Sequence, residues 1–204
     1  FDAHHFLEEA SRNGATGAIV EQDPGAAARG GVVVVPDTTR ALQALGHAAR
    51  MTYRGPVVGL TGSSGKTTTR ALTALALSPL GSIHQTVGNL NNHIGVPLTL
   101  LGMPEGAQAM VIEMGTSSPG EIAALAEIAR PNVRLIVNVG PAHLEELGGL
   151  EGVALEKGAL FASARPGETV CVNVDDPRVA AVPIPAGVRR LEWGSSGHIA
   201  LREI

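Results

Sequence analysis

The chain has 204 residues, of which 44% are hydrophobic and only 2% aromatic, so it can bury a substantial core built mainly from aliphatic side chains. Its net charge of -4 comes without a long run of Lys or Arg, which argues against nucleic acid or an anionic membrane as the main partner. A single cysteine, Cys171, excludes a disulfide framework and a cysteine-based zinc site, and no apolar run reaches the ~20 residues that span a bilayer. We therefore expect a folded protein of the reducing cytoplasm, with no membrane span and no signal peptide.

The first 54 residues are typical of part of a small α/β domain. Hydrophobic periodicity and turn residues predict a helix at 3–12, a strand at 17–21, a strand at 32–35 and a helix at 38–51. The residues at 53–56, which include Gly55 and Pro56, then break the pattern. We place a domain boundary near Arg54, which gives domains at 1–54 and 55–204.

Strands and helices alternate along the second domain. Strands are predicted at 56–60, 109–114, 133–139, 169–174 and 188–193, and helices after the first of these strands and at 119–130 and 150–162. Such alternation predicts an α/β fold with a mostly parallel sheet covered by helices.

A Gly/Ser-rich turn joins the first of these strands to the helix that follows. It consists of Thr61, Gly62, Ser63, Ser64, Gly65, Lys66, Thr67 and Thr68. Backbone N-H groups and a helix dipole in this position can surround a polyphosphate, Lys66 can reach its terminal phosphates, and the Thr67 hydroxyl can ligate Mg²⁺. The general pattern G-x-x-x-x-G-K-[ST] would place Gly at position 60, where this chain has Leu60, so the loop belongs to a variant class.

The run at 58–68 resembles the ATP loop of the Mur ligase family, which uses T-G-x-x-G-K-[ST] in place of the general form. Further blocks agree with the family in order and spacing, so that the resemblance covers nearly the whole chain; they lie at 111–115, 120–122, 138–144 and 156–158. The segment at 88–98 resembles the one typical of family members that add D-alanyl-D-alanine to a UDP-muramoyl tripeptide. The opening residues at 1–7 resemble a piece of the family's first, UDP-substrate-binding domain.

The resemblance implies an ATP-dependent amide ligase of peptidoglycan precursor synthesis. ATP and Mg²⁺ would be its cofactors, and UDP-N-acetylmuramoyl tripeptide and D-alanyl-D-alanine its substrates; we expect a cytoplasmic monomer. Residues 1–54 would end the UDP-substrate-binding domain, 55–204 would form the central ATP-binding domain, and the third, ligase domain would be absent, so this chain alone would not complete the reaction. Another ligase of the same superfamily and a noncatalytic nucleotide-binding fragment stay open as alternatives.

Three residues at or near strand ends are candidates for the metal and the phosphates. Glu113 ends a predicted strand at the edge where open α/β sheets place ligands, and its carboxylate could hold Mg²⁺, although a solvated strand-end carboxylate has the same sequence signature. His143 follows the predicted strand at 133–139; a lone histidine is usually structural, but the family carries a metal-binding histidine in this block. Asn138 could orient phosphate or metal-bound water, or simply cap the turn.

The remaining candidates depend on the resemblance. Asn89, Asn91 and Asn92 supply amides suited to a polar substrate, with a polar turn as the alternative. Lys157 lies in the block where Mur ligases carry a carbamylated lysine, whose anionic oxygens would join Glu113 and His143 around Mg²⁺. The alternative is a solvent-facing helix lysine. The resemblance thus implies catalytic roles for Lys66, His143 and Lys157.

Overall fold

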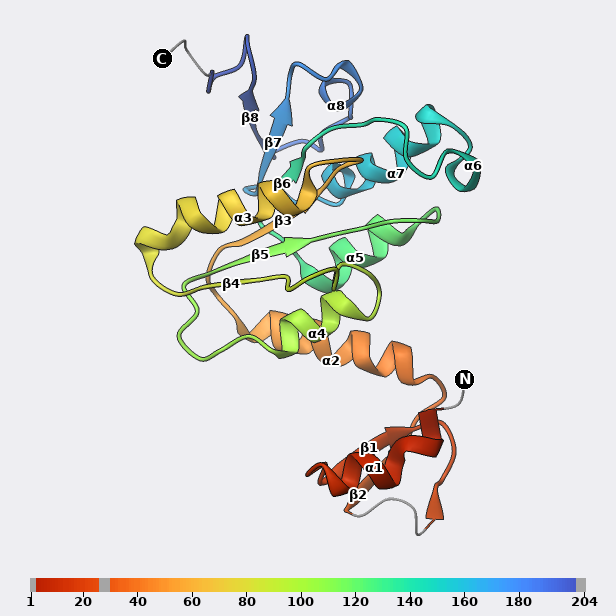
Figure 1. Ribbon diagram of the computed structural model, residues 1–204. Helices are drawn as coiled ribbons and strands as arrows, with labels where there is room; N and C mark the ends of the chain where they lie inside the picture. The colour runs from red at the N-terminus through yellow and green to blue at the C-terminus, as the bar shows by residue number, and fades with distance from the viewer. Residues whose placement is uncertain (1–2, 26–29, 201–204) are drawn as a thin grey trace. The chain divides into compact units, whose positions relative to one another are not determined.

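The computed structural model describes residues 3–25 and 30–200 (Figure 1). These residues form two compact units, with the division between residues 44 and 45. Phe1 and Asp2, which open the segment that resembles the family's first domain, lie outside the described residues. The first unit contains η1 (Ala3–Phe6), α1 (Leu7–Arg12), β1 (Gly17–Val20) and β2 (Gly31–Val34). The two strands pair in parallel, from Gly17 opposite Gly31 to Val20 opposite Val34.

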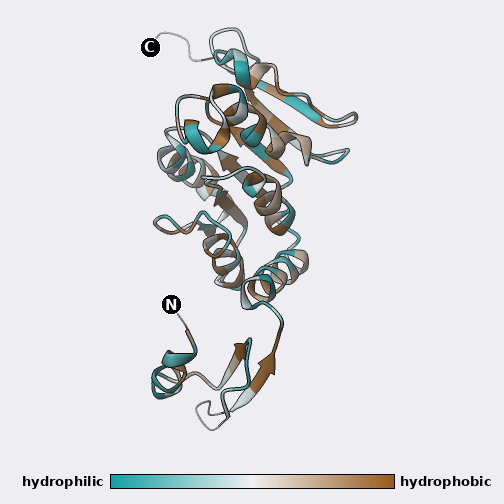
Figure 2. Cartoon of the chain, turned by 90° about the vertical axis from the view of Figure 1, so that its right-hand side faces the viewer, coloured by the Kyte–Doolittle hydropathy of each residue, from teal (hydrophilic) through white to brown (hydrophobic). Residues whose placement is uncertain are grey.

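This two-stranded sheet is strongly hydrophobic, as the brown colour of its arrows shows in Figure 2. Nevertheless, Val33 and Val34 are 56% and 55% exposed. Parallel sheets are normally covered on both faces. The first unit therefore buries only part of its apolar surface within the described residues.

The helix α2 (Thr38–Thr52) runs across the division between the units. At its beginning, the backbone N-H and the hydroxyl of Thr38 both donate to Glu21 at 3.0 Å, within the first unit. Near its end, Arg50 donates to the carbonyl oxygens of Ala129 and Arg130, within the second unit. The division at 44/45 thus falls inside α2, before the predicted boundary near Arg54, because the second half of this helix packs on the larger unit.

The larger unit is built on one six-stranded sheet in which every pair of neighbours is parallel. In spatial order the strands are β4 (Ile83–Gln85), β5 (Ala109–Glu113), β3 (Val57–Thr61), β6 (Val133–Ile136), β7 (Thr169–Asn173) and β8 (Arg189–Trp193). The helices and 3-10 turn that connect them are α3 (Lys66–Leu77), η3 (Ser78–Leu80), α4 (Gly95–Leu101), α5 (Glu121–Ala129), α6 (Leu144–Leu147), α7 (Leu150–Ala162) and α8 (Pro177–Ala180). The predicted α/β fold with a mostly parallel sheet is confirmed.

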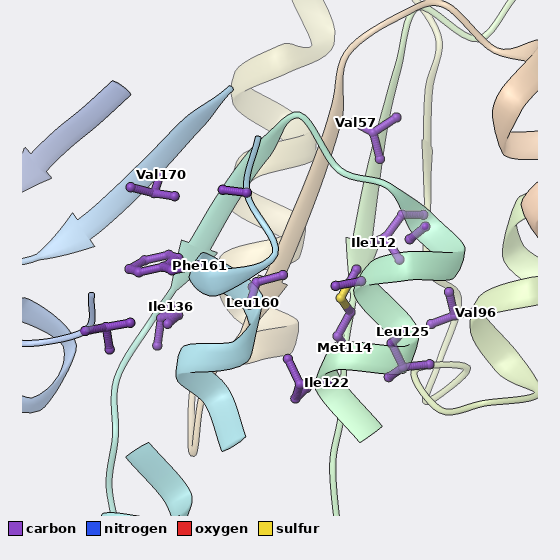
Figure 3. Packing of buried hydrophobic residues seen from close by; sticks show 14 of the residues in the cluster. Val57, Val96, Ile112, Met114, Ile122, Leu125, Ile136, Leu160, Phe161 and Val170 are labelled. Atoms are coloured by element: carbon purple, nitrogen blue, oxygen red, sulfur yellow. The ribbon is translucent and has the colours of Figure 1, made fainter. Parts of the chain in front are cut away.

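Side chains from β3 and β5 alternate between two hydrophobic clusters, one on each face of the sheet. Val57 and Ile112 belong to the larger cluster, which also contains Ile122 of α5 and Phe161 of α7 (Figure 3). Val58, Leu60 and Val111 belong to the smaller cluster with Ala74 of α3. Since β3 and β5 are buried along their whole length, their carboxyl ends are fixed points on which a site can be built.

Among the helices of the described residues, none has the length and apolar character needed to cross a membrane.

Candidate functional site

The Gly/Ser-rich loop connects the buried strand β3 to α3. Gly65, directly before the helix, has φ +74°, a left-handed conformation that favours glycine. A Cβ at Gly62 would come within 2.9 Å of the Val137 side chain, so the loop backbone packs closely on the end of β6. No side chain caps the start of α3. Its first backbone N-H groups and the positive end of the helix dipole are an arrangement that suits an anion.

The segment after β6 fastens this loop from the side. Asn138 accepts a hydrogen bond from the Ser64 N-H at 3.0 Å, and its NH₂ group donates to the Ser64 carbonyl oxygen and hydroxyl, both at 3.2 Å. The Ser63 hydroxyl accepts from the Gly140 N-H and donates to its carbonyl oxygen, each at 2.9 Å. The strand predicted at 133–139 ends at Ile136 because the residues after it leave the sheet to hold the loop. Of the two interpretations of Asn138, its contacts match the turn-capping one.

Lys66 and Thr67, the first residues of α3, point their polar atoms in different directions. The Lys66 ammonium folds back over the loop and donates to the Gly62 carbonyl oxygen at 2.9 Å. The Thr67 hydroxyl donates to a carboxylate oxygen of Glu113 at 3.2 Å. In the sheet register Glu113 lies opposite Leu60. The end of β5 therefore meets the start of the Gly/Ser-rich loop at 61–68, which we call the phosphate loop.

Glu113 is a buried carboxylate with side-chain partners on α3 and in the segment at 88–98. Its side chain is only 2% exposed. Besides Thr67, it accepts from the Asn91 NH₂ group at 2.9 Å and lies 3.6 Å from the Arg70 guanidinium. A buried charge is tolerated only when it is paired and hydrogen-bonded, and Glu113 meets that condition. The alternative interpretation as a solvated strand-end carboxylate is therefore wrong.

The three asparagines at 89–92 serve different contacts. Asn91 donates to Glu113, as above, and Asn92 accepts from the N-H groups of Ile94 and Gly95 at 3.1 and 2.8 Å, where α4 begins. Asn89 is exposed, and its carbonyl oxygen accepts from the Asn91 N-H at 2.7 Å. The polar-turn interpretation thus describes Asn92, while Asn91 ties this segment to the end of β5.

A pocket of about 300 Å³ brings several predicted residues together. Its lining comprises Lys66, Asn91, Asn92, His93, Gly115, Thr116, Ser117, Glu121 and His143. His143 is exposed and has φ +52°, a left-handed conformation that is uncommon for a residue with a side chain. Lys66, Asn91 and His143 therefore share one cavity, although they are far apart in the sequence.

Lys157 lies on α7 with only 3% of its surface exposed. Within the part of the chain that the structure describes, its ammonium has no hydrogen bond and no ion pair. Burial, together with the positive charge of Lys66 and against the negative charge of Glu156, lowers the pKa of Lys157 to about 8. The solvent-facing interpretation of this lysine is wrong, and a larger share of it is neutral near neutral pH than of a lysine with the ordinary pKa.

Two charged residues of the site were missed by sequence reasoning. Arg70, one helical turn after Lys66, lies beside Glu113 and donates to the Gly88 carbonyl oxygen at 3.1 Å. Its i+4 spacing from Lys66 on the predicted helix was a usable signal. Glu156 is 6% exposed and accepts hydrogen bonds from the start of α5. No local pattern indicates that contact, because its partners come from another helix.

Across residues 3–25 and 30–200, no group of three or more His, Cys, Asp and Glu side chains could hold a metal ion. Glu113 and His143 would therefore need a ligand of another type to complete a metal site. The Thr67 hydroxyl beside the Glu113 carboxylate offers hard oxygen donors of the kind that Mg²⁺ prefers. The residues present fit Mg²⁺ on this ground.

A parallel sheet whose central strand runs through a Gly-rich loop into a Lys-Thr helix start defines a P-loop α/β domain. The family model described as "Mur ligase middle domain" matches residues 60–202. The chain thus belongs to the Mur ligase family, as the sequence predicted.

Individual relatives give a consistent result. The chain is 41% identical over 158 residues to a UDP-N-acetylmuramoyl-tripeptide--D-alanyl-D-alanine ligase of Bacillus subtilis, covering 77% of this chain and 35% of the relative. A crystal structure of MurF from Acinetobacter baumannii matches with a TM-score of 0.91 and 37% identity, over 100% of this chain and 45% of that one. MurF ligase from Thermotoga maritima, solved in complex with ADP, matches with a TM-score of 0.85 and 36% identity, over 97% and 45%. The chain therefore spans less than half the length of these proteins.

Proposed function

We propose that this chain is the ATP-binding part of a ligase that joins D-alanyl-D-alanine to UDP-N-acetylmuramoyl tripeptide in peptidoglycan precursor synthesis. The observation that carries the proposal is the contact network around Glu113, which links Thr67 of the phosphate loop to Asn91 of the segment at 88–98. That segment resembles the one typical of ligases with this substrate, and the relatives at 36–41% identity bear the corresponding name or title. The ADP complex of the T. maritima relative supports nucleotide binding by the same fold.

In the proposed reaction, a terminal carboxylate oxygen of the tripeptide attacks the γ-phosphorus of ATP and ADP departs. The amine of D-alanyl-D-alanine then attacks the acyl carbon of the acyl phosphate, loses a proton, and phosphate departs. Such chemistry depends on positioning and charge neutralisation and needs no protein nucleophile. Residues 61–68 would hold the phosphates, with Lys66 turning from its contact with Gly62 toward them. Thr67 and Glu113 would hold Mg²⁺, which supplies charge neutralisation at the phosphates.

Substrate contacts would come from the pocket beside the loop. Asn91 and Asn92 line it, although each already uses part of its amide within the protein. Asn89 is exposed next to them. We propose that these three side chains contact the tripeptide substrate, that Asn138 acts on the nucleotide through the loop it fastens, and that residues 1–54 belong to the UDP-substrate-binding domain. Location in the cytoplasm and a monomeric state remain predictions.

Lys157 would be carbamylated in this proposal. Its neutral amine attacks CO₂, the new N-C bond forms, and one proton leaves, so that a cation becomes an anionic oxygen ligand that joins Glu113 and His143 at a second metal. Burial, the lack of a partner and the pKa of about 8 support the modification, because only the neutral amine reacts. A ¹³C spectrum with labelled bicarbonate should show a carbamate signal in the wild type and none in Lys157→Ala. Identical spectra of the two proteins would contradict this assignment.

The function is tested by phosphate release in the presence of ATP, UDP-N-acetylmuramoyl tripeptide and an amine. The assay compares this chain with a chimera in which the remaining sequence of the B. subtilis relative completes it, and with that relative as positive control. We expect the chimera to release phosphate with D-alanyl-D-alanine and much less with single amino acids. Preference for a single amino acid would indicate another Mur-type ligase, and ATP binding without turnover in the chimera would indicate a noncatalytic nucleotide-binding module.

A further inference from the structure

Glu156 is a buried carboxylate that the proposed reaction does not use. It lies on α7, is 6% exposed, and accepts hydrogen bonds from the N-H groups of Gly120 and Ile122 at 2.6 and 2.7 Å. The Thr116 hydroxyl also donates to it, at 3.3 Å. Gly120 directly precedes α5 and has φ +87°, and no side chain of its own caps that helix. Glu156 therefore satisfies the first N-H groups of α5 from a different helix, where a negative charge is also favoured by the helix dipole.

The same loop is held from a second side by Glu121. Its carboxylate accepts from the N-H groups of Ser117 and Ser118 at 2.6 and 3.0 Å. Burial by itself raises the pKa of Glu121, but these hydrogen bonds outweigh it and lower the pKa below its ordinary value. Two carboxylates thus immobilise the residues at 116–120. Because Thr116 and Ser117 line the pocket that also contains Lys66 and His143, this loop is one wall of the candidate substrate site.

Neighbouring residues on α7 face different parts of the site. Consecutive side chains on a helix are turned by about 100° from each other. Glu156 reaches the loop before α5, while Lys157 is close enough to Lys66 for that ammonium to depress its pKa. One turn of α7 is therefore in contact with the pocket wall and within electrostatic reach of the phosphate loop.

We propose that Glu156 is a positioning residue, which holds the pocket wall at 116–120 at a fixed place relative to the phosphate loop. The peptide substrate would then be bound at a fixed position relative to ATP. The peptide part of this inference rests on the proposed function. Without the carboxylate, the N-H groups of Gly120 and Ile122 lose their charged acceptor, and the wall can move. The phosphate loop is fastened by Ser63 and Asn138 instead, so it should keep its geometry. Glu156 therefore affects peptide binding selectively.

The test uses Glu156→Gln, which keeps the side-chain volume but turns an NH₂ group toward backbone donors. Glu151→Gln is the matched control, since Glu151 lies on the same helix with a side chain that is 88% exposed. Hydrogen exchange at 116–122 and at 62–68 is compared with the affinities for UDP-N-acetylmuramoyl tripeptide and Mg²⁺-ATP measured by calorimetry. We expect Glu156→Gln to speed exchange at Gly120 and Ile122 by about tenfold or more, to weaken tripeptide binding by about tenfold, and to leave ATP affinity within about twofold. The control should match the wild type in all four.

Unchanged exchange at 116–122 in Glu156→Gln would overturn the inference, and so would an equal loss of ATP and tripeptide affinity, since that indicates a general structural role. If Glu156→Gln does not fold, Thr116→Val removes the hydroxyl that contacts both Glu156 and the Ser118 carbonyl oxygen, and leaves the carboxylate in place. This variant should speed exchange only around 116–118, and no change there would count against the inference. A wild-type chain that binds ATP but no tripeptide would contradict the proposed function, while selective loosening of the loop would still support positioning by Glu156.

Discussion

At the scale of single residues, the candidate site is organised by charges that are buried and therefore sensitive to what surrounds them. Glu113 balances its charge with Arg70, Thr67 and Asn91, whereas Lys157 has no such partner among the described residues. Burial and the nearby positive charge of Lys66 outweigh the negative charge of Glu156, so the pKa of Lys157 is lowered. The paired carboxylate and the unpaired lysine are thus suited to different tasks, the first to a fixed geometry and the second to chemical modification.

Lys66 should dominate the affinity for Mg²⁺-ATP, because the rest of the loop offers mainly backbone N-H groups to the phosphates. We expect Lys66→Met to weaken binding by on the order of a hundredfold in calorimetry. Arg178→Met, which removes a cation on α8 that does not line the pocket at Lys66, serves as the control and should bind normally. Equal affinity of Lys66→Met and the wild type would show that the loop is not the phosphate site.

The lowered pKa of Lys157 predicts a specific pH dependence of stability. Between about 8 and the ordinary value of 10.5, the unfolded lysine holds a proton that the folded one has released. The unfolded state binds more protons there, so the free energy of unfolding should rise as the pH increases through this window. The penalty for burying the cation is fully present below about pH 8. Urea titrations in CO₂-free buffer should show the wild type gaining about 2–3 kcal/mol relative to Lys157→Met over this range. Parallel curves for the two proteins would contradict the shift.

At the scale of elements, the second half of α2 is attached to the end of α5 by two side chains, His47, which contacts the Ile128 carbonyl oxygen at 3.2 Å, and Arg50. Arg50 is 9% exposed and donates to the carbonyl oxygens of Ala129, Arg130 and Tyr53 at 2.7–3.0 Å. These include the last carbonyl of α5, where a cation also complements the helix dipole. The planar guanidinium reaches all three acceptors at once, which an ammonium cannot do.

We therefore expect Arg50→Met to lower the free energy of unfolding by about 2–4 kcal/mol, since it removes one buried and two part-buried hydrogen bonds to carbonyl oxygens. Arg50→Lys should recover less than half of this loss. Arg54→Met, at an exposed position just after α2, is the control and should change stability by less than about 0.5 kcal/mol. Urea unfolding of the three variants measures the differences, and an Arg50→Met protein as stable as the control would refute the capping role.

The elements that sequence analysis predicted well are those with a long hydrophobic pattern of their own. The strands β3, β5 and β7 and the helices α2 and α7 lie within a few residues of their predicted bounds. The short β4, α4, α6 and α8 were not predicted, because three to seven residues carry too little periodicity. The strand predicted at 133–139 is shorter because Asn138 and Gly140 bond to the phosphate loop, a contact between residues 74 to 77 positions apart.

In the candidate site, too, contiguous features could be predicted and contacts between distant residues could not. The phosphate loop is contiguous, so its shape between β3 and α3 could be predicted from spacing alone. The environment of Glu113 depends on Asn91 and Arg70, and that of Lys157 on the packing of α7, which only the folded chain reveals. Sequence analysis singled out Glu113, Asn91 and Lys157, mainly through the family resemblance, but it missed Arg70, and the burial and partners of all four required the structure.

At the scale of the whole molecule, the chain supplies a six-stranded P-loop sheet but spans only 35% of the length of the B. subtilis ligase that it resembles. In the proposed function, nucleotide binding would use residues at 61–68 and Glu113, all within this chain. Ligation must in addition hold a carboxylate and an amine in line with ATP, and misplacing reactants by about 1 Å can cost about a hundredfold in rate. ATP binding and amide formation should therefore respond differently when the rest of the relative's sequence is added to this chain.

We expect this chain and the chimera completed with B. subtilis sequence to bind Mg²⁺-ATP within about tenfold of each other, while the chain alone forms the amide bond at least about a hundred times more slowly. Calorimetry and product formation with tripeptide and D-alanyl-D-alanine measure the two quantities on the same preparations. The chimera with Lys66→Met controls for contaminating ligase, because it should lose turnover altogether. Amide formation by the chain alone at the rate of the chimera would show that 204 residues suffice to position all three substrates, and the proposed division of labour between this domain and the rest of the relatives' sequence would then be wrong.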